Sequence, residues 1–321
     1  MAVYTDVSAA ALSGFLEGYD IGTLTAVKGI AEGVENSNFL LGTTAGTYIL
    51  TLYEKRVAAG DLPFFVSLLE HLAGKGLNCP QPVANRAGAA LGELCGRPAA
   101  IMTFLDGVWI ADPQPEHCRA LGAVLAELHG AVADFPLSRP NPLSVAGWHG
   151  LLDQAEERAD TVVPGLAAEA AAALAEVEAC WPAGLPGGVV HADLFPDNVF
   201  FLGDRLSGII DFYFACTDSF AYDLSICLNA WCFDAAHRFD PARSRALMAG
   251  YASVRPLSTA EAAALPVLAR GSALRFMLTR LVDWLNVPPG ALVKPKDPRE
   301  YLAKLRFHRG VEDPRTYGVA G

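Results

Sequence analysis

Short apolar runs, separated by small and polar residues, mark the first third of the chain. Such runs predict β-strands, whereas apolar residues three and four positions apart predict helices. Helical spacing follows Ser8, a suitable N-cap, and returns after Asp61. The predicted strands cover residues 24–30, 39–43, 48–53, 91–94 and 99–105, and the predicted helices cover residues 7–19 and 61–74. We therefore expect a small five-stranded antiparallel unit that ends near residue 104.

The pattern changes to helical spacing after residue 105. Leucines recur on one side of long stretches, and an alanine-rich stretch has high intrinsic helix propensity. The predicted helices cover residues 115–132, 151–160, 167–181, 224–231, 241–253 and 260–285, followed by a helical tail. These elements predict an α+β fold, with an N-terminal domain over residues 1–104 and a larger, mainly α-helical domain over residues 105–321. The connecting backbone, which includes Met102 and Phe104, could bind the edge of an adenine base.

Composition narrows the class of protein. A hydrophobic fraction of 52% and a charged fraction of 18% indicate a globular chain. The net charge of −11 argues against nucleic acid or an anionic membrane as a partner. No apolar run reaches the roughly 18 residues of a spanning helix, and the N-terminus lacks the features of a signal peptide. The seven cysteines form no CxxC pair, which is typical of reduced thiols in a cytoplasmic protein.

One polar motif interrupts the apolar runs of the second domain. It consists of His191, Asp193 and Asn198, then a predicted hairpin with a Gly-Asp turn, and finally Asp211 at the end of the second strand. Asp193 could accept the proton of an attacking hydroxyl. Asn198 and Asp211 offer the hard oxygen ligands that Mg²⁺ prefers. Because a hairpin folds back on itself, we expect Asp211 to lie beside Asn198.

An acidic surface loop is the alternative interpretation of this motif. It accounts well for Asp197 and Asp204, which occupy predicted turns. It accounts poorly for Asp211, because a carboxylate at the end of an apolar run is costly to bury without a partner. Asp223 also has two interpretations: it could stabilise the start of a helix, or point back and bind backbone N–H groups of the 191–198 loop.

A polar, glycine-containing loop lies between the first two predicted strands. Its backbone amides could approach phosphate oxygens, and Asn36, Ser37 and Asn38 could add side-chain donors next to Gly33. It is not a P-loop, since it has no Gly-Lys-Ser/Thr and no following helix. The alternative is an ordinary hairpin turn.

The chain resembles the aminoglycoside-phosphotransferase/choline-kinase superfamily, which has a protein-kinase-like fold. The likeness extends over nearly the whole chain, and within the superfamily it is strongest to the homoserine kinases that use this fold. The resemblance implies two lobes, a five-stranded sheet lobe and a helical lobe, that bind ATP and Mg²⁺. The segments that carry it are residues 28–38, 48–56, 191–201, 211–216 and 222–231.

The resemblance also implies roles for residues of the motif. Asp193 would be the general base, and Asn198 and Asp211 would bind Mg²⁺. His191 and Asp223 would support the catalytic loop, and the 33–38 loop would cover the ATP phosphates. Many family members carry Lys or Arg on the third strand, where this chain has Thr51; Lys28 or Lys55 could replace that cation.

Homoserine is the acceptor that the resemblance implies. Its carboxylate suits an arginine, and its ammonium suits a carboxylate. Arg275 and Asp218 are the candidates for these contacts, and Trp231 is a candidate pocket wall, although core packing is the favoured explanation of this tryptophan. Two alternatives remain: a kinase of the same fold for an aminoglycoside, choline or methylthioribose, and a nucleotide-binding pseudokinase.

Overall fold

The computed structural model describes residues 5–30, 36–54, 58–287 and 295–319. The chain divides into two compact units, one of Met1–Asp106 with Gly208–Tyr213 and the other of Gly107–Ser207 with Phe214–Gly321. The break after Asp106 falls two residues beyond the boundary that the sequence suggested. The short return of Gly208–Tyr213 to the first unit has no counterpart in the sequence-based division.

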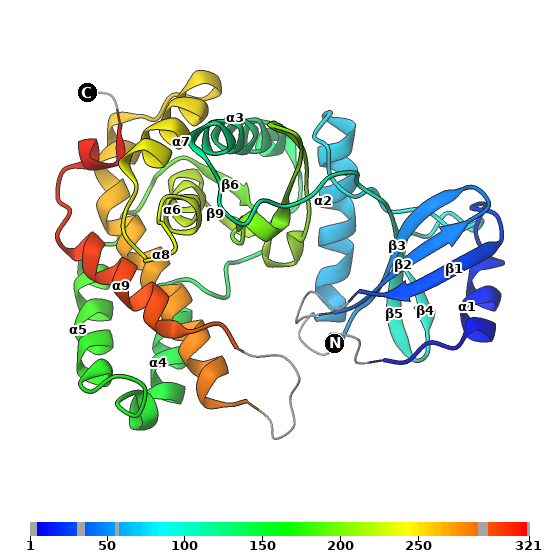
Figure 1. Cartoon of the computed structure of the whole chain (residues 1–321), viewed down its shortest axis with the longest axis horizontal. Helices are drawn as coiled ribbons and strands as arrows, with labels where there is room; N and C mark the ends of the chain where they lie inside the picture. Colours follow the sequence, from blue (N-terminus) through cyan, green and yellow to red (C-terminus); the bar gives the residue numbers. More distant parts are fainter. Residues whose placement is uncertain (1–4, 31–35, 55–57, 288–294, 320–321) are drawn as a thin grey trace. The chain divides into compact units, whose positions relative to one another are not determined.

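The first unit is built on a five-stranded antiparallel sheet (Figure 1). Its strand order is β1-β2-β3-β5-β4, so the third strand along the chain lies at the centre. The sequence therefore predicted the number and direction of the strands correctly. Their bounds are β1 (Leu24–Gly29), β2 (Ser37–Thr43), β3 (Gly46–Leu52), β4 (Gly92–Leu94) and β5 (Arg97–Thr103).

One face of this sheet is closed by α1 (Ala9–Leu16). Burial alternates strictly along β2, so that Phe39 and Leu41 point into a shared core with Leu12 and Leu16 of the helix. Ser8 caps α1 through its hydroxyl, as predicted. A second helix, α2 (Leu62–Gly74), follows the short turn η1 (Ala59–Asp61).

The second unit is mainly helical (Figure 1). Two of its helices, α6 and α8, bury most of their residues, because apolar residues surround each helix instead of lining one stripe. The helices are α3 (Pro115–Ala131), α4 (Val145–Ala159), α5 (Leu166–Ala179), α6 (Phe220–Trp231), α7 (Pro241–Val254), α8 (Thr259–Leu285) and α9 (Pro298–Arg309). Of the helices in the described residues, none is both long and apolar enough to cross a membrane.

Short strands and turns lie between these helices, and the segment Gly208–Tyr213 among them belongs to the first unit. They form two two-stranded sheets, β6 with β9 and β7 with β8. The elements are η2 (Val132–Asp134), β6 (Gly187–Val190), η3 (Pro196–Asn198), β7 (Val199–Leu202), β8 (Arg205–Ile209), η4 (Phe212–Phe214), β9 (Cys216–Ser219) and η5 (Pro314–Tyr317). The hairpin after Asn198 is therefore confirmed, whereas β9 was not predicted from the sequence.

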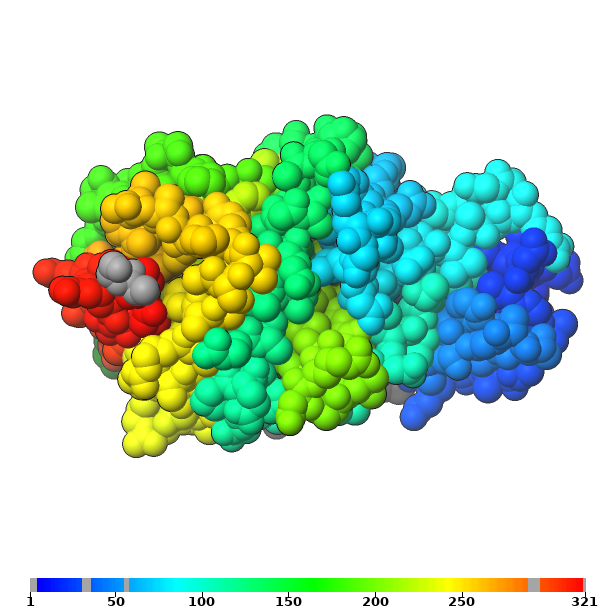
Figure 2. All heavy atoms as spheres, turned by 90° about the horizontal axis from the view of Figure 1, so that it is seen from above, coloured from blue at the N-terminus to red at the C-terminus, as the bar shows by residue number. Residues whose placement is uncertain are grey.

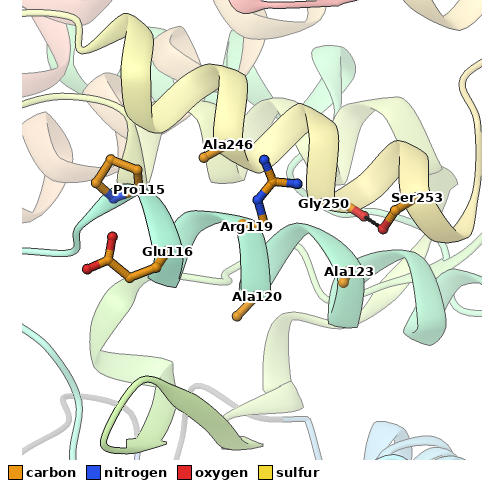
Figure 3. Close-up of a pocket in the computed structure, with 8 residues that line it drawn as sticks. All are labelled: Pro115, Glu116, Arg119, Ala120, Ala123, Ala246, Gly250 and Ser253. Atoms are coloured by element: carbon orange, nitrogen blue, oxygen red, sulfur yellow. Dashed lines mark hydrogen bonds between the residues drawn. The ribbon is translucent and has the colours of Figure 1, made fainter.

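Helices α3 and α7 lie side by side, as the green-cyan and yellow spheres of Figure 2 show. Their backbones approach so closely that a Cβ atom at Gly122 would meet the carbonyl of Leu247, and one at Gly250 would meet the carbonyl of Arg119. A shallow hollow of about 540 Å³ opens along this contact (Figure 3). It contains none of the residues of the polar motif.

Candidate active site

The polar motif forms a loop between β6 and β7, and its backbone is held by side chains from the surrounding helices. The carboxylate of Asp223, in the first turn of α6, accepts hydrogen bonds from the N–H groups of His191 and Ala192, each at 2.9 Å. Asp223 is fully buried. The side chain of Asp223 thus points back to the 191–198 loop, which is one of the two orientations that the sequence suggested.

The next backbone groups of the loop are also bonded. The carbonyl of Ala192 accepts from Nη1 of Arg275 at 2.6 Å, and the N–H of Asp193 donates to Nδ1 of His191 at 3.2 Å. The carbonyl of Leu194 accepts from the indole N–H of Trp231 at 2.9 Å. The loop is thus held through its backbone groups, which are bonded to side chains of α6 and α8 and to His191.

Asn198 has a defined orientation. Its Nδ2 donates to the carbonyl of Asp193 at 2.8 Å, while the N–H of Phe195 donates to the same oxygen at 2.9 Å. Because the NH₂ end of the amide must face that carbonyl, Oδ1 of Asn198 faces away from it. An amide oxygen that is not turned to this carbonyl is a donor of the kind that a metal ligand provides.

A directed chain of hydrogen bonds supports Asp223. Arg255 donates to the hydroxyl of Tyr251 at 3.1 Å, Tyr251 contacts Nδ1 of His129 at 2.8 Å, and Nε2 of His129 contacts Asp223 at 3.1 Å. Arginine can only donate and an ionised carboxylate can only accept, so the chain runs in one direction, with a neutral His129 that donates from Nε2.

The pKa shifts agree with these protonation states. Burial lowers the pKa of His129, although Asp223 opposes the shift. Burial alone would raise the pKa of Asp223, but the hydrogen bond from His129 and the charges nearby bring it below its ordinary value. The carboxylate that binds the loop is therefore ionised at neutral pH.

Asp211 belongs to the first unit and lies just after β8. Its φ of 65° places it in the left-handed region, which a residue with a side chain rarely adopts. Its Oδ1 is buried. The negative charge of Asp211 acts on Tyr213, whose pKa is raised to about 12, mainly by burial.

The residues predicted to contact phosphates lie at the start of β2 and are bonded to Glu54 and Thr51. Oδ1 of Asn36 accepts from the N–H of Glu54 at 3.3 Å, and the hydroxyl of Ser37 donates to Glu54 at 2.8 Å. Oδ1 of Asn38 accepts from the hydroxyl of Thr51 at 2.8 Å. These bonds join the start of β2 to the end of β3. Gly33, like Lys55, lies outside the described residues.

Three other predicted nucleotide-binding residues lie on the sheet or directly after it. Lys28 is exposed on β1, opposite Leu40 of β2. Met102 is buried in β5, and Phe104, just beyond that strand, is 41% exposed. Thr51 occupies the buried third-strand position, and its hydroxyl is bonded to Asn38.

The predicted acceptor-binding residues differ in exposure. Arg275 and Trp231 are 2% and 1% exposed, and both donate to the backbone of the 191–198 loop. This burial argues against direct contact with an acceptor. Asp218, on β9, is half-buried and accepts from Asn141 at 2.7 Å. Burial raises the pKa of Asp218, and the hydrogen bond from Asn141 opposes that shift.

His129 is the supporting residue that the sequence did not single out for this site. It is separated from Asp223 by 94 residues, so no local spacing could connect the two. Its place at the end of the leucine stripe of α3 was the one available signal, since a histidine on a buried stripe needs polar partners.

A divalent metal fits the donors that the chain offers. The described residues contain no cluster of three or more His, Cys, Asp or Glu side chains that could hold a metal ion by themselves. The motif offers an amide oxygen at Asn198 and a carboxylate at Asp211, each within its own compact unit. Either is a donor of the kind that Mg²⁺ takes, since this ion is usually bound by one or two protein oxygens together with water and substrate phosphates.

Comparison with known proteins gives concordant matches. The model of the phosphotransferase enzyme family matches residues 26–257. A homoserine kinase of Methylobacterium radiotolerans is 67% identical over 318 residues, which cover 99% of each chain. A homoserine kinase of Xanthobacter autotrophicus is 66% identical over 320 residues, which cover 100% of each chain.

The fold is also found among solved structures. The amicoumacin kinase hAmiN, in complex with AMP-PNP, Ca²⁺ and Ami, superposes with a TM-score of 0.70. The match covers 96% of this chain and 92% of that chain, at 16% sequence identity. At this identity the likeness concerns the fold alone.

Proposed function

Since the chain belongs to the phosphotransferase enzyme family, we propose that it transfers a phosphoryl group from ATP to the hydroxyl of homoserine. The observation that carries this proposal is the 67% identity to a homoserine kinase over 99% of both chains. The family match confirms the resemblance recognised in the sequence, including the protein-kinase-like fold.

Asp193 is the proposed general base, or the group that orients the acceptor hydroxyl. Phosphoryl transfer requires little covalent chemistry from the protein, so catalysis depends on positioning and on neutralising charge. Three hydrogen bonds support this role, because they hold the backbone around Asp193: Asp223 accepts from the N–H groups of His191 and Ala192, and Nδ1 of His191 accepts from the N–H of Asp193. His191 and Asp223 are thus proposed to be positioning residues.

Asn198 and Asp211 are the proposed ligands of Mg²⁺. When bound, the metal would bridge and neutralise the phosphates of ATP. The hydrogen bond from Asn198 to the carbonyl of Asp193 supports this assignment, because it occupies the NH₂ end of the amide and turns the amide oxygen away from that carbonyl. The same bond would couple the metal ligand to the proposed base.

The first unit is proposed to bind ATP. The backbone of the 33–38 loop would contact the phosphates, with Asn36, Ser37 and Asn38 holding that loop against β3. The connection around Met102 and Phe104 would bind the adenine. Because Thr51 replaces the usual third-strand cation, we propose that Lys28 or Lys55 supplies the positive charge.

Asp218 is proposed to bind the ammonium group of homoserine. Each of its oxygens already accepts one hydrogen bond, from Asn141 and from the N–H of Ser219, and a carboxylate has room for more. We also propose that the enzyme works in the cytoplasm. All seven cysteines lie in the described part of the chain and carry free thiols, which suits a reducing compartment.

A coupled assay of ADP release tests the proposed function. The purified protein is given ATP, Mg²⁺ and one of four acceptors: homoserine, choline, an aminoglycoside or methylthioribose. We expect kcat/KM to be highest for homoserine. A higher kcat/KM with another acceptor would assign the chain to a different substrate. ATP binding without turnover on any acceptor would identify a pseudokinase.

A further inference from the structure

Arg275 of α8 is a buried cation directly behind the proposed catalytic loop. It is 2% exposed and donates from Nη1 to the carbonyl of Ala192 at 2.6 Å. Ala192 has a φ of 62°, in the left-handed region, and is 1% exposed. The carbonyl that Arg275 binds belongs to the peptide group that joins Ala192 to Asp193.

That peptide group is held at both of its polar atoms. Arg275 binds its oxygen, and Nδ1 of His191 accepts its N–H at 3.2 Å. A peptide group is planar, so two such bonds fix the orientation of the plane from which Asp193 extends. On the other side of Ala192, the N–H groups of residues 191 and 192 are held by Asp223. Ala192, the residue with a left-handed backbone before Asp193, is therefore bonded on both sides, to Asp223 of α6 and to Arg275 of α8.

The guanidinium of Arg275 is itself immobilised. Its Cζ lies 4.4 Å from the ring centre of Phe276 and 5.8 Å from that of Phe214. Both rings therefore offer cation–π contacts to the guanidinium. The contact with the loop thus rests on a rigid support.

The charge of Arg275 is not balanced by an ion pair. Within the described part of the chain, no carboxylate lies within 4.0 Å of its guanidinium nitrogens. Arginine stays charged when buried, and an isolated buried charge is costly. An apolar side chain of similar size would fill the same space at lower cost. The structure retains a cation here, and its Nη1 donates to the loop.

We propose that Arg275 is a positioning residue for the phosphoryl transfer. It holds the peptide of Asp193 so that the carboxylate points towards the acceptor hydroxyl, and it does not bind the acceptor. This inference rests on the proposed function of Asp193. It replaces the sequence-based interpretation of Arg275 as a ligand of the acceptor carboxylate.

The test compares Arg275→Lys and Arg275→Met with the same substitutions at Arg270. Arg270 lies on the same helix, and its Nε contacts only the carbonyl of Pro266. We expect Arg275→Met to lower kcat about 100-fold, as a displaced reacting group does, while KM for homoserine and for ATP stays near wild type. Arg275→Lys keeps the charge and one donor, so its kcat should be intermediate. The Arg270 variants should keep wild-type kcat.

Hydrogen–deuterium exchange of the amides of residues 191–198 is measured in parallel. Faster exchange in the Arg275 variants, with normal exchange in the Arg270 variants, supports the proposal. A raised KM for homoserine at wild-type kcat would show acceptor binding instead and would overturn it. If Arg275→Met does not fold, Arg275→Lys decides: wild-type kcat and exchange in that variant overturn the proposal. If wild type does not phosphorylate homoserine, the proposed function fails, whereas the exchange data still test the loop contact.

Discussion

At the scale of single residues, the site depends on backbone conformations that cannot be recognised from the amino-acid sequence. In the described residues, four non-glycine residues have a positive φ, and two of them, Ala192 and Asp211, are in the polar motif. Such conformations cost about 1–3 kcal/mol each and persist where surrounding contacts enforce them. Two hydrogen bonds of Ala192 are contacts of this kind: its N–H donates to Asp223, and its carbonyl accepts from Arg275.

Ala192→Gly tests this strain. Glycine adopts a positive φ without the cost of about 1–2 kcal/mol that alanine pays, but it gains about 0.5–1 kcal/mol of entropy in the unfolded chain. We therefore expect the free energy of unfolding to rise slightly or stay unchanged in urea denaturation. The control is Ala168→Gly, at an exposed position within α5, which should lose about 1 kcal/mol. An equal loss at both positions would mean that Ala192 is not strained.

At the scale of elements, the sequence predicted the helices and the hairpin of the site better than the contacts between distant segments. Leucine spacing located the helices, and the Gly-Asp turn located the hairpin after Asn198, because both signals are local. The helix that contains Trp148 was expected to begin at residue 151, yet α4 begins at Val145. The pairing of β6 with β9 and the contact of Arg275 with Ala192 join distant segments, and no periodicity encodes such contacts.

A buried histidine joins three elements of the second unit. His308 of α9 contacts the hydroxyl of Tyr317 at 2.8 Å and Oδ1 of Asn229, on α6, at 3.1 Å. It is fully buried, and burial lowers its pKa to about 3. The ring is therefore neutral in the folded protein at every pH at which the protein is normally studied.

This pKa predicts how stability depends on pH. The unfolded chain binds a proton at His308 below about pH 6.5, while the folded protein does not until about pH 3. The contribution of His308 to the free energy of unfolding is therefore fully present above about pH 6.5 and is lost as the pH falls towards 3. The loss reaches about 2 kcal/mol at pH 5.

His308→Gln should flatten the fall in unfolding free energy between pH 7 and pH 5, measured in urea at each pH. The variant is expected to be less stable at pH 7, because it loses buried hydrogen bonds, but less sensitive to acid. His149→Gln is the control, since that side chain is 50% exposed on α4. An unchanged slope in His308→Gln would show that another group causes the acid sensitivity.

At the scale of the whole molecule, the two proposed metal ligands belong to different compact units. Asn198 lies in the unit formed by Gly107–Ser207 and Phe214–Gly321, and Asp211 lies in the returning segment Gly208–Tyr213. The polar motif is thus continuous in sequence but divided between the units. The contacts of Asn198 with Asp193 and of Asp211 with Tyr213 place each ligand within its own unit.

A double-mutant cycle tests whether both residues bind one Mg²⁺. Asn198→Ala and Asp211→Asn are made singly and together, and ATP affinity is measured over a Mg²⁺ titration. Two ligands of one ion should be non-additive, with a coupling energy of about 0.5–3 kcal/mol. Asp197→Asn is the control, because that carboxylate is 51% exposed and bonded to Lys296. Strictly additive losses would place the two residues at separate sites.

The most direct test of the account is the phosphorylation of homoserine by wild type and by Asp193→Asn, with ATP affinity measured on both proteins. We predict that wild type forms O-phosphohomoserine and ADP in equal amounts. We predict that Asp193→Asn binds ATP with wild-type affinity and has a kcat lower by about 10²–10⁴-fold. Wild-type turnover in Asp193→Asn, or no phosphohomoserine from wild type, would contradict the account.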